Sequence, residues 1–330
     1  MRKKAYQVIS FGLMVLVALV TYVKPVSASP IELTYNSVFL ETQIGGKMQK
    51  KWCEEVERRS KGRVKIKFYS AGKLYKYKPA ERALASGALD ISQFGIFQMG
   101  FILQACSLPC LFDSWDQIKQ FHNQGGREIL IKGLETHKLR PLFAIPFASI
   151  TTILRKPVRT LEDVKGLKLR SPTAQLIDYL GQLGASNVHI ATAEVYQALQ
   201  LGTIDGVVST TETYIRRKWH ETVRYFLDTP LGLYPQYSVI NLDKWNSLPI
   251  DIQKIMVEVS KEIEDDLYDK IGRYDDEIRE KLRGLLETYA LPPDEYIRWA
   301  KKARPVWDDW AKQGSCYAEA LELAKKIVGK

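Results

Sequence analysis

Residues 160–175, TLEDVKGLKLRSPTAQ, contain an arginine whose position suits it to bind an anion. The segment is typical of a short strand, in which Lys168 and Arg170 share one face while Leu167 and Leu169 point the other way. The strand stops beside Pro172, so Arg170 stands at its carboxyl end. A guanidinium presents parallel donors that match a carboxylate, and it stays charged. The pattern favours either an anion-binding arginine or an ordinary surface ion pair.

The sequence contains no catalytic motif beside this arginine. It has neither a G-x-S-x-G elbow nor a complete phosphate-binding loop, and His220-Glu221 begins a zinc-protease pattern in which Arg224 takes the place of the second histidine. We therefore expect a protein that is not an enzyme and that carries no cofactor. A ligand-bridging metal ion stays open, without support from the sequence.

The four cysteines are Cys53, Cys106, Cys110 and Cys316. They offer no second pair or histidine at metal-ligand spacing. Cys106 and Cys110, in CSLPC, can close a small disulfide loop in an exported protein. Their apolar flanks equally fit free cysteines in a core, so both alternatives stay open.

Residues 1–28 are predicted to be a secretory signal peptide. Three basic residues precede an apolar run over 11–23, and Val26-Ser27-Ala28 fits a cleavage site after Ala28. The run is shorter than the roughly 20 residues of a membrane span. Removal of four basic and no acidic residues lowers the formal charge from +10 to 10 − 4 = +6. The remaining basic residues are scattered among acidic ones, which argues against a nucleic-acid partner.

The chain alternates strand-like and helix-like segments. Strands are expected over 31–37, 62–70 and 88–95, with helical segments between them, which favours parallel α/β sheets. ALASGALDI at 83–91 and ALQLGTIDG at 198–206 share A-L-x-x-G-x-x-D, with a glycine suited to follow a helix. Two such units predict two lobes built alike. Ligands bind beyond the carboxyl ends of strands in such sheets, so residues 92–100 and 207–214 should face each other across a cleft.

The C-terminal third has a different pattern. Apolar residues recur every three or four positions from Ile255 to Leu285, which predicts one very long helix, or two meeting near Gly272, lying along both lobes. A coiled-coil arm is the alternative, although the spacing is not strictly heptad. The tryptophans at 299, 307 and 310 are interpreted as core.

Taken together, these segments resemble the solute receptors of TRAP (tripartite ATP-independent periplasmic) transporters, the DctP family. The resemblance rests on TLEDVKGLKLRSPTAQ, LGASNVHIATAEVYQALQLGTIDGV, SGALDIS, LPCLFDSWD, VRYF and KWNSLPIDIQ, and spans essentially the whole mature chain. It implies an α/β two-lobe periplasmic binding protein (Venus flytrap) with hinge strands and a long C-terminal helix spanning both lobes. Lobe I is expected to comprise 29–150 and 238–275, and lobe II 151–237 and 276–330.

The resemblance also implies a function. The expected ligand is a small carboxylate, delivered as by other family members to a permease of small DctQ-type and large DctM-type subunits. We expect a monomer. An ABC-type receptor, a sensory two-lobe module and a secreted carboxylate-processing enzyme are the alternatives. The tail helix and the strand of Arg170 disfavour the ABC type.

Site residues follow from the same resemblance. The family's arginine in this strand forms a salt bridge to the substrate carboxylate and matches Arg170. Local matches add Asn36, Phe97, Gln98, Thr173, Ser209, Thr211, Glu212 and Gln236. Some members, such as sialic acid receptors, have a further arginine upstream; here Ile150 falls near that place and Arg155 lies too far along, so a second clamp is not expected.

Four aromatic residues complete the expected site or belong to the lobe cores. If they line the cleft, they favour a monocarboxylate with an apolar body. They are Tyr35, Phe97, Tyr234 and Tyr237.

Overall fold

The computed structural model describes residues 29–95 and 102–330, so the expected signal peptide, Phe97 and Gln98 lie outside the described residues. The described strands form one mixed sheet in the order β2-β1-β3-β8-β4-β7-β5-β6, with β9 paired to β8. The strands are β1 (Ile31–Asn36), β2 (Val64–Tyr69), β3 (Ile91–Gly95), β4 (Leu139–Leu154), β5 (Lys168–Arg170), β6 (Ser186–Asn187), β7 (Gly206–Thr210), β8 (Tyr225–Asn241) and β9 (Glu287–Tyr289).

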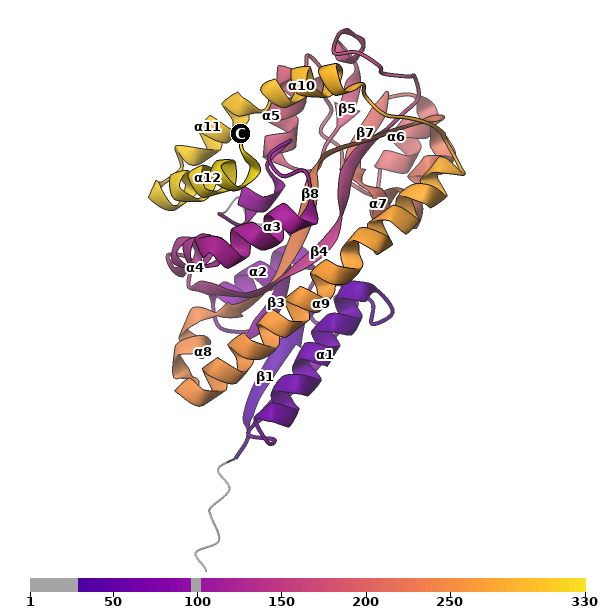
Figure 1. The fold of residues 1–330 in the computed structure, drawn as a ribbon. Coiled ribbons are helices and arrows are strands. Elements are labelled where there is room, and N and C mark those ends of the chain that lie inside the picture. The colour runs from indigo at the N-terminus through magenta and orange to yellow at the C-terminus, as the bar shows by residue number, and fades with distance from the viewer. Residues whose placement is uncertain (1–28, 96–101) are drawn as a thin grey trace, which may run out of the picture.

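Helices cover the sheet and form the C-terminal region (Figure 1). The α-helices are α1 (Ile44–Arg59), α2 (Tyr77–Ala85), α3 (Trp115–Phe121), α4 (Arg127–Glu135), α5 (Ala174–Gln182), α6 (Val195–Leu201), α7 (Thr211–Arg216), α8 (Leu242–Ser247), α9 (Ile250–Arg283), α10 (Pro293–Lys301), α11 (Arg304–Ala311) and α12 (Ser315–Val328). Short helical turns are η1 (Ile102–Ser107), η2 (His122–Gly126), η3 (Glu162–Val164) and η4 (Trp219–Thr222).

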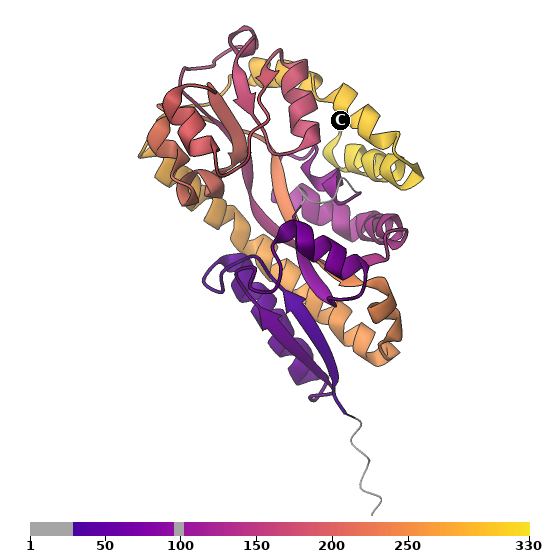
Figure 2. The same ribbon diagram turned by 180° about the vertical axis from the view of Figure 1, so that it is seen from behind.

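Two long antiparallel strands join the two halves of the sheet. β4 and β8, of 16 and 17 residues, pair along nearly their whole length. The carboxyl-terminal part of β8 pairs with β3, and that of β4 pairs with β7. Each long strand therefore runs from one half into the other, and Figure 2 shows these two crossings from behind. Their register shifts at three places, two of them at Pro141 and Pro146, which lack the N–H that a regular ladder needs.

Within each half the predicted parallel pairing is confirmed. β1 pairs in parallel with β2 and β3, and β5 pairs in parallel with β6 and β7. The repeated sequence motif lies at equivalent places, because Gly87 and Gly202 both follow a helix with φ near +75° (76° and 73°). Asp90 accepts hydrogen bonds from Thr34 N and Oγ1 at 2.7 and 2.8 Å, and Asp205 accepts one from Lys168 N at 2.8 Å. Each aspartate thus ties its strand to the parallel neighbour.

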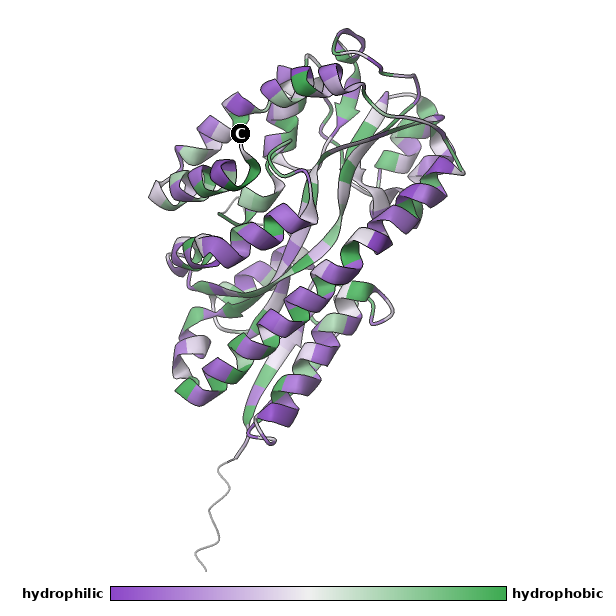
Figure 3. Ribbon diagram, in the orientation of Figure 1, coloured by the Kyte–Doolittle hydropathy of each residue, from purple (hydrophilic) through white to green (hydrophobic). Residues whose placement is uncertain are grey.

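The long tail helix is a single helix of 34 residues that continues through Gly272. Figure 1 shows it crossing both halves of the sheet, beside α1 and over the long strands. One stripe of α9 is buried against the rest of the chain, while Figure 3 shows polar residues on its outer face. The stripe is thus covered within the chain, unlike that of a coiled-coil arm; it comprises Ile252, Met256, Val259, Ile263, Leu267 and Ile271.

The C-terminal helices form part of the core, as predicted from their tryptophans. Trp299, Trp307 and Trp310 are at most 3% exposed, and Trp307 Nε1 donates to the carbonyl oxygen of Pro109 at 2.7 Å. α12 contacts α3, α4 and η1. In the described residues, no helix is both long and apolar enough to cross a membrane.

All four cysteines are free thiols in this structure, which agrees with the free-cysteine alternative for Cys106 and Cys110. Burial raises the pKa of Cys106 to about 12 and that of Cys110 to about 11. A thiol reacts through its thiolate, so both are expected to be inert at neutral pH.

A thiol titration of the protein purified without reductant tests this directly. The denatured protein is expected to yield four thiols, whereas native Cys53, Cys106 and Cys110 should react only slowly. Two thiols after denaturation would show that a disulfide forms instead.

Candidate functional site

A cavity of about 490 Å³ lies where the two halves of the sheet and the long strands meet. The first half contributes Val38–Leu40, Gln43 and Lys78. The long strands contribute Phe147, Tyr234 and Gln236. The second half contributes Arg170, Pro172, Thr192, Ser209, Thr210, Thr213, Arg216, Arg217 and Trp219. We refer to this cavity as the cleft.

Arg170 ends β5 and reaches the cleft while its neighbour Leu169 packs in the core. Pairing of β5 with β6 and β7 on its two sides fixes this alternation. The arginine is only 6% exposed. Its Nη2 donates to Thr192 Oγ1 at 3.0 Å, and its Nε has no hydrogen-bond partner among the described residues.

The charge of Arg170 is therefore buried without a compensating carboxylate among the described residues. Burial lowers its pKa, and the nearby positive charge of Arg217 lowers that pKa further. Arginine nevertheless stays protonated at neutral pH. An unpaired ion taken out of water costs several kcal/mol, so the geometry favours binding of an anion beside Arg170.

An aromatic wall lies next to these cations. The Phe39 and Phe147 ring centroids are 5.4 Å apart, and those of Phe147 and Tyr234 are 6.0 Å apart. A Cβ at Gly95, the last residue of β3, would stand 2.4 Å from Tyr234 Oη, so only glycine permits this approach. The wall offers an apolar surface to a ligand beside the charged one.

Of the nine predicted site residues, the structure brings three together in the cleft: Arg170, Ser209 and Gln236. Ser209 is near the end of β7, and Gln236 lies on β8, where its Oε1 accepts a hydrogen bond from Gln93 Nε2. Their roles toward a ligand stay predictions.

The side chains of Asn36 and Thr173 form hydrogen bonds with backbone groups of the protein itself. Asn36 Nδ2 donates to Tyr75 O at 3.2 Å, and Asn36 Oδ1 accepts from Tyr75 N at 3.1 Å. Thr173 is the N-cap of α5, and its Oγ1 accepts from Leu176 N at 3.2 Å. Neither side chain is among those lining the cleft.

Thr211 and Glu212 are the first two residues of α7. Both form hydrogen bonds with residues of other elements, and Glu212 also bonds to Arg216 within the helix. Thr211 Oγ1 donates to Asp275 Oδ1 at 2.9 Å. Glu212 accepts from Gln43 Nε2 at 3.3 Å, a contact between the two halves, and from Arg216 Nε at 3.1 Å. These bonds position α7, which carries cleft residues, but leave both side chains outside the lining.

Among the aromatic candidates that the structure describes, one lines the cleft and the others lie in the core. Tyr234 lines the cleft, whereas Tyr35 packs edge-on against Trp52 and Phe68 with centroids 6.0 and 5.3 Å away. Tyr237 is also in the core, with its hydroxyl 3.2 Å from His122 Nε2. Ile150 is buried in β4, and Arg155 follows the end of that strand away from the cleft lining.

Sequence reasoning missed several lining residues. Arg216 and Arg217 stand in the run YIRRKW, and their charge was the only available signal. Thr192 lies in one of the segments that carry the resemblance, but nothing in its spacing marked it as the partner of Arg170. Lys78 and Phe147 had no sequence signal.

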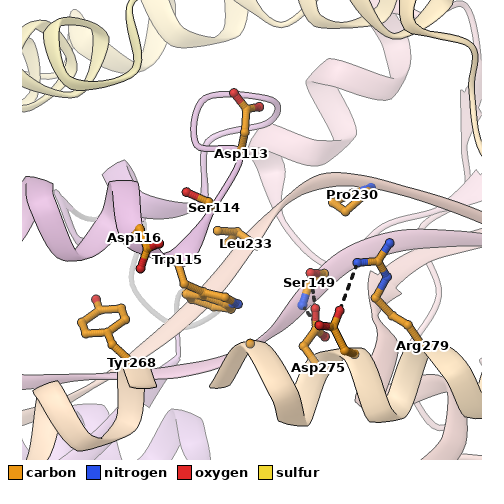
Figure 4. Close-up of a pocket in the computed structure, with 12 residues that line it drawn as sticks. Asp113, Ser114, Trp115, Asp116, Ser149, Pro230, Leu233, Tyr268, Asp275 and Arg279 are labelled. Atoms are coloured by element: carbon orange, nitrogen blue, oxygen red, sulfur yellow. Dashed lines mark hydrogen bonds and ion pairs between the residues drawn. The ribbon is translucent and has the colours of Figure 1, made fainter. Parts of the chain in front are cut away.

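A second cavity, of about 270 Å³, lies on the other face of the long strands (Figure 4). Leu233 lines it, whereas the next residue, Tyr234, lines the cleft. Asp275 accepts hydrogen bonds from Ser149 N, at 3.0 Å, and from Ser149 Oγ. Within the part of the chain that the structure describes, no group of three or more His, Cys, Asp or Glu is arranged to hold a metal ion. The acidic side chain of Asp275 here anchors α9 to the sheet.

Comparison with known proteins identifies the family. The model of the bacterial extracellular solute-binding protein family 7, DctP, matches residues 35–313. The chain belongs to this family. The predicted recognition is thereby confirmed.

Relatives and solved structures agree with the family. The C4-dicarboxylate-binding periplasmic protein DctP of Rhodobacter capsulatus is 23% identical over 296 residues, covering 88% of this chain and 89% of the relative. The sialic acid-binding periplasmic protein SiaP of Vibrio cholerae is 27% identical over 201 residues, covering 59% of this chain and 63% of the relative.

The fold matches TRAP periplasmic solute-binding proteins. One from Ochrobactrum anthropi gives a TM-score of 0.83 at 22% identity, covering 91% of this chain and 97% of that one. DctP7 of Bordetella pertussis, which binds pyroglutamic acid, gives 0.77 at 20% identity, covering 89% and 99%. The predicted two-lobe α/β fold with its long C-terminal helix is confirmed.

Proposed function

We propose that this protein is the periplasmic receptor of a TRAP transporter, and that it binds an organic acid in the cleft and delivers it to the membrane permease. The buried guanidinium of Arg170, which has no carboxylate partner among the described residues, carries this proposal. A ligand carboxylate would complete the free hydrogen-bonding edge of the guanidinium and compensate its charge. The lining of cations, amides, hydroxyls and aromatic rings suits binding and orientation of such a ligand.

Related proteins support the class of ligand. The Rhodobacter capsulatus relative is a C4-dicarboxylate-binding protein. TRAP proteins of similar fold were solved with orotic acid and with β-D-galacturonate. Together with the pyroglutamic acid receptor, these ligands share a carboxylate, the group that Arg170 is suited to bind.

The lobes are proposed to close on the ligand by bending of β4 and β8. In this proposal lobe I comprises 29–150 and 238–275, and lobe II comprises 151–237 and 276–330. The receptor is a monomer exported by cleavage after Ala28, and its permease has DctQ-type and DctM-type subunits. A ligand that contacts both lobes stabilises the closed form through its higher affinity for that form.

A thermal-shift screen of residues 29–330 tests the binding function. Each organic acid is paired with its primary amide, which has the same skeleton but no charge. A bound acid is expected to raise the melting temperature in proportion to the logarithm of its concentration, whereas its amide should not. Equal stabilisation by the amides would contradict an arginine-centred site. Consumption of an acid, followed by NMR, would indicate an enzyme instead.

A further inference from the structure

The cleft contains more positive charge than one carboxylate can compensate. Its lining includes Lys78, Arg170, Arg216 and Arg217, and the lining residues that the structure describes include no Asp or Glu. Glu212, just outside the lining, forms an ion pair with Arg216 at 3.1 Å. Lys78, Arg170 and Arg217 have no ion-pair partner among the described residues. Glu212 also acts on Arg217, whose pKa it raises against the larger lowering by burial and by Arg216. Positive charge therefore exceeds negative charge at the cleft.

Arg170 and Arg217 occupy different places in the second half. Arg170 is buried at the end of β5, whereas Arg217 is exposed at the C-terminal end of α7. They are close enough for the charge of Arg217 to lower the pKa of Arg170. Lys78 lies on α2 in the other half. An anion at Arg217 would relieve this repulsion, and Lys78 adds positive charge to the same cleft from the other half.

The cleft offers a ligand an apolar surface as well as positive charge. Phe39, Phe147 and Tyr234 form the aromatic wall, and Trp219 follows two residues after Arg217. A ligand held at both arginines would share the cleft with this aromatic surface. Hydrocarbon or aromatic groups are favoured there, because burying polar groups against rings without hydrogen bonds costs free energy.

From this arrangement we infer that Arg217, with Lys78, forms a second anion subsite, so that the ligand carries two negatively charged groups on an apolar body. The inference rests on the proposed function, because Arg170 must hold the first group. It replaces the monocarboxylate expected from the sequence with a diacid, and it makes Arg217 a specificity-determining residue.

Two other roles for Arg217 predict different results. A cation at the end of α7 interacts favourably with the helix dipole, which would affect stability but not ligand choice. General electrostatic steering scales with the charge of the ligand, so removal of the neighbouring cation Lys218 would weaken a diacid as much as removal of Arg217. A subsite instead discriminates between a diacid and the monoacid of the same skeleton.

Calorimetric titration with matched acids distinguishes these roles. The pairs are succinate with butyrate, adipate with hexanoate, and terephthalate with benzoate. The unsubstituted protein is expected to bind at least one diacid more tightly than its monoacid by about tenfold or more, since a hydrogen bond to a charged group contributes about 1.5–3 kcal/mol. Arg217→Gln should remove this preference by weakening the diacid alone.

Lys218→Gln is the matched control, because it removes the same charge from the next residue. Lys218 lies outside the cleft lining and is 3.9 Å from Glu221. This variant should keep the preference. The inference is overturned if the monoacids bind as tightly as the diacids, or if Arg217→Gln weakens both equally. Binding of no acid in the panel, or full binding by Arg170→Ala, would count against the proposed function itself.

Discussion

Arg170→Ala is expected to weaken binding of the organic acid by about 100-fold or more while the protein stays folded. A bidentate, charge-assisted contact in a desolvated site contributes about 3 kcal/mol or more when one partner is removed, which corresponds to this loss. Stability should be nearly unchanged, because the guanidinium bonds only to Thr192 among the described residues and its burial is itself unfavourable. Calorimetry measures the affinity, and thermal unfolding of the ligand-free variant measures stability.

Two further variants make this result specific. Arg224→Ala removes an exposed arginine of the same half, which pairs with Glu287 at 2.5 Å, and should leave the affinity unchanged. Arg170→Lys keeps the charge but loses the planar pair of donors, so an intermediate affinity is expected. Unchanged affinity in Arg170→Ala would show that the carboxylate binds elsewhere.

Asp275→Ala is expected to lower the free energy of unfolding by about 2–4 kcal/mol. Asp275 is 4% exposed and accepts hydrogen bonds from Ser149 N, Ser149 Oγ and Thr211 Oγ1. Its removal leaves the N–H of a long strand and the first hydroxyl of α7 without their acceptor. Because Arg217 directly follows α7, the ligand affinity should fall as well. Urea unfolding and calorimetry measure the two effects.

The adjacent aspartate offers a close control for this variant. Asp276 follows on α9, has a side chain 73% exposed, and lies 3.7 Å from Arg279. Exposed ion pairs contribute little, so Asp276→Ala should change stability by no more than about 0.5 kcal/mol. Comparable losses in the two variants would mean that helix charge, and not the anchoring of α9 to β4 and α7, determines the effect.

Much of the fold was accessible from sequence because its signals are local. Alternating apolar residues predicted β1 and β2, and the three-to-four spacing predicted α9. The repeated A-L-x-x-G-x-x-D motif indicated two similar halves, since a left-handed glycine after a helix and an aspartate before a strand are short-range requirements. The joining of both halves into one sheet by β4 and β8 was less accessible, because it depends on pairing between residues 71 to 102 positions apart.

The functional site shows the same distinction between short-range signals and long-range contacts. The sequence by itself determined the family, the alternating strand that ends in Arg170, and a set of polar candidates around it. Only the tertiary structure decided that Ser209 and Gln236 face the cleft while Asn36 and Thr173 bond to nearby backbone, and that Lys78 and Arg217 join Arg170 there. The physical reason is that the direction of a side chain at the end of a strand or helix depends on distant elements packed beside it, whereas residue type and short-range periodicity are written in the chain itself.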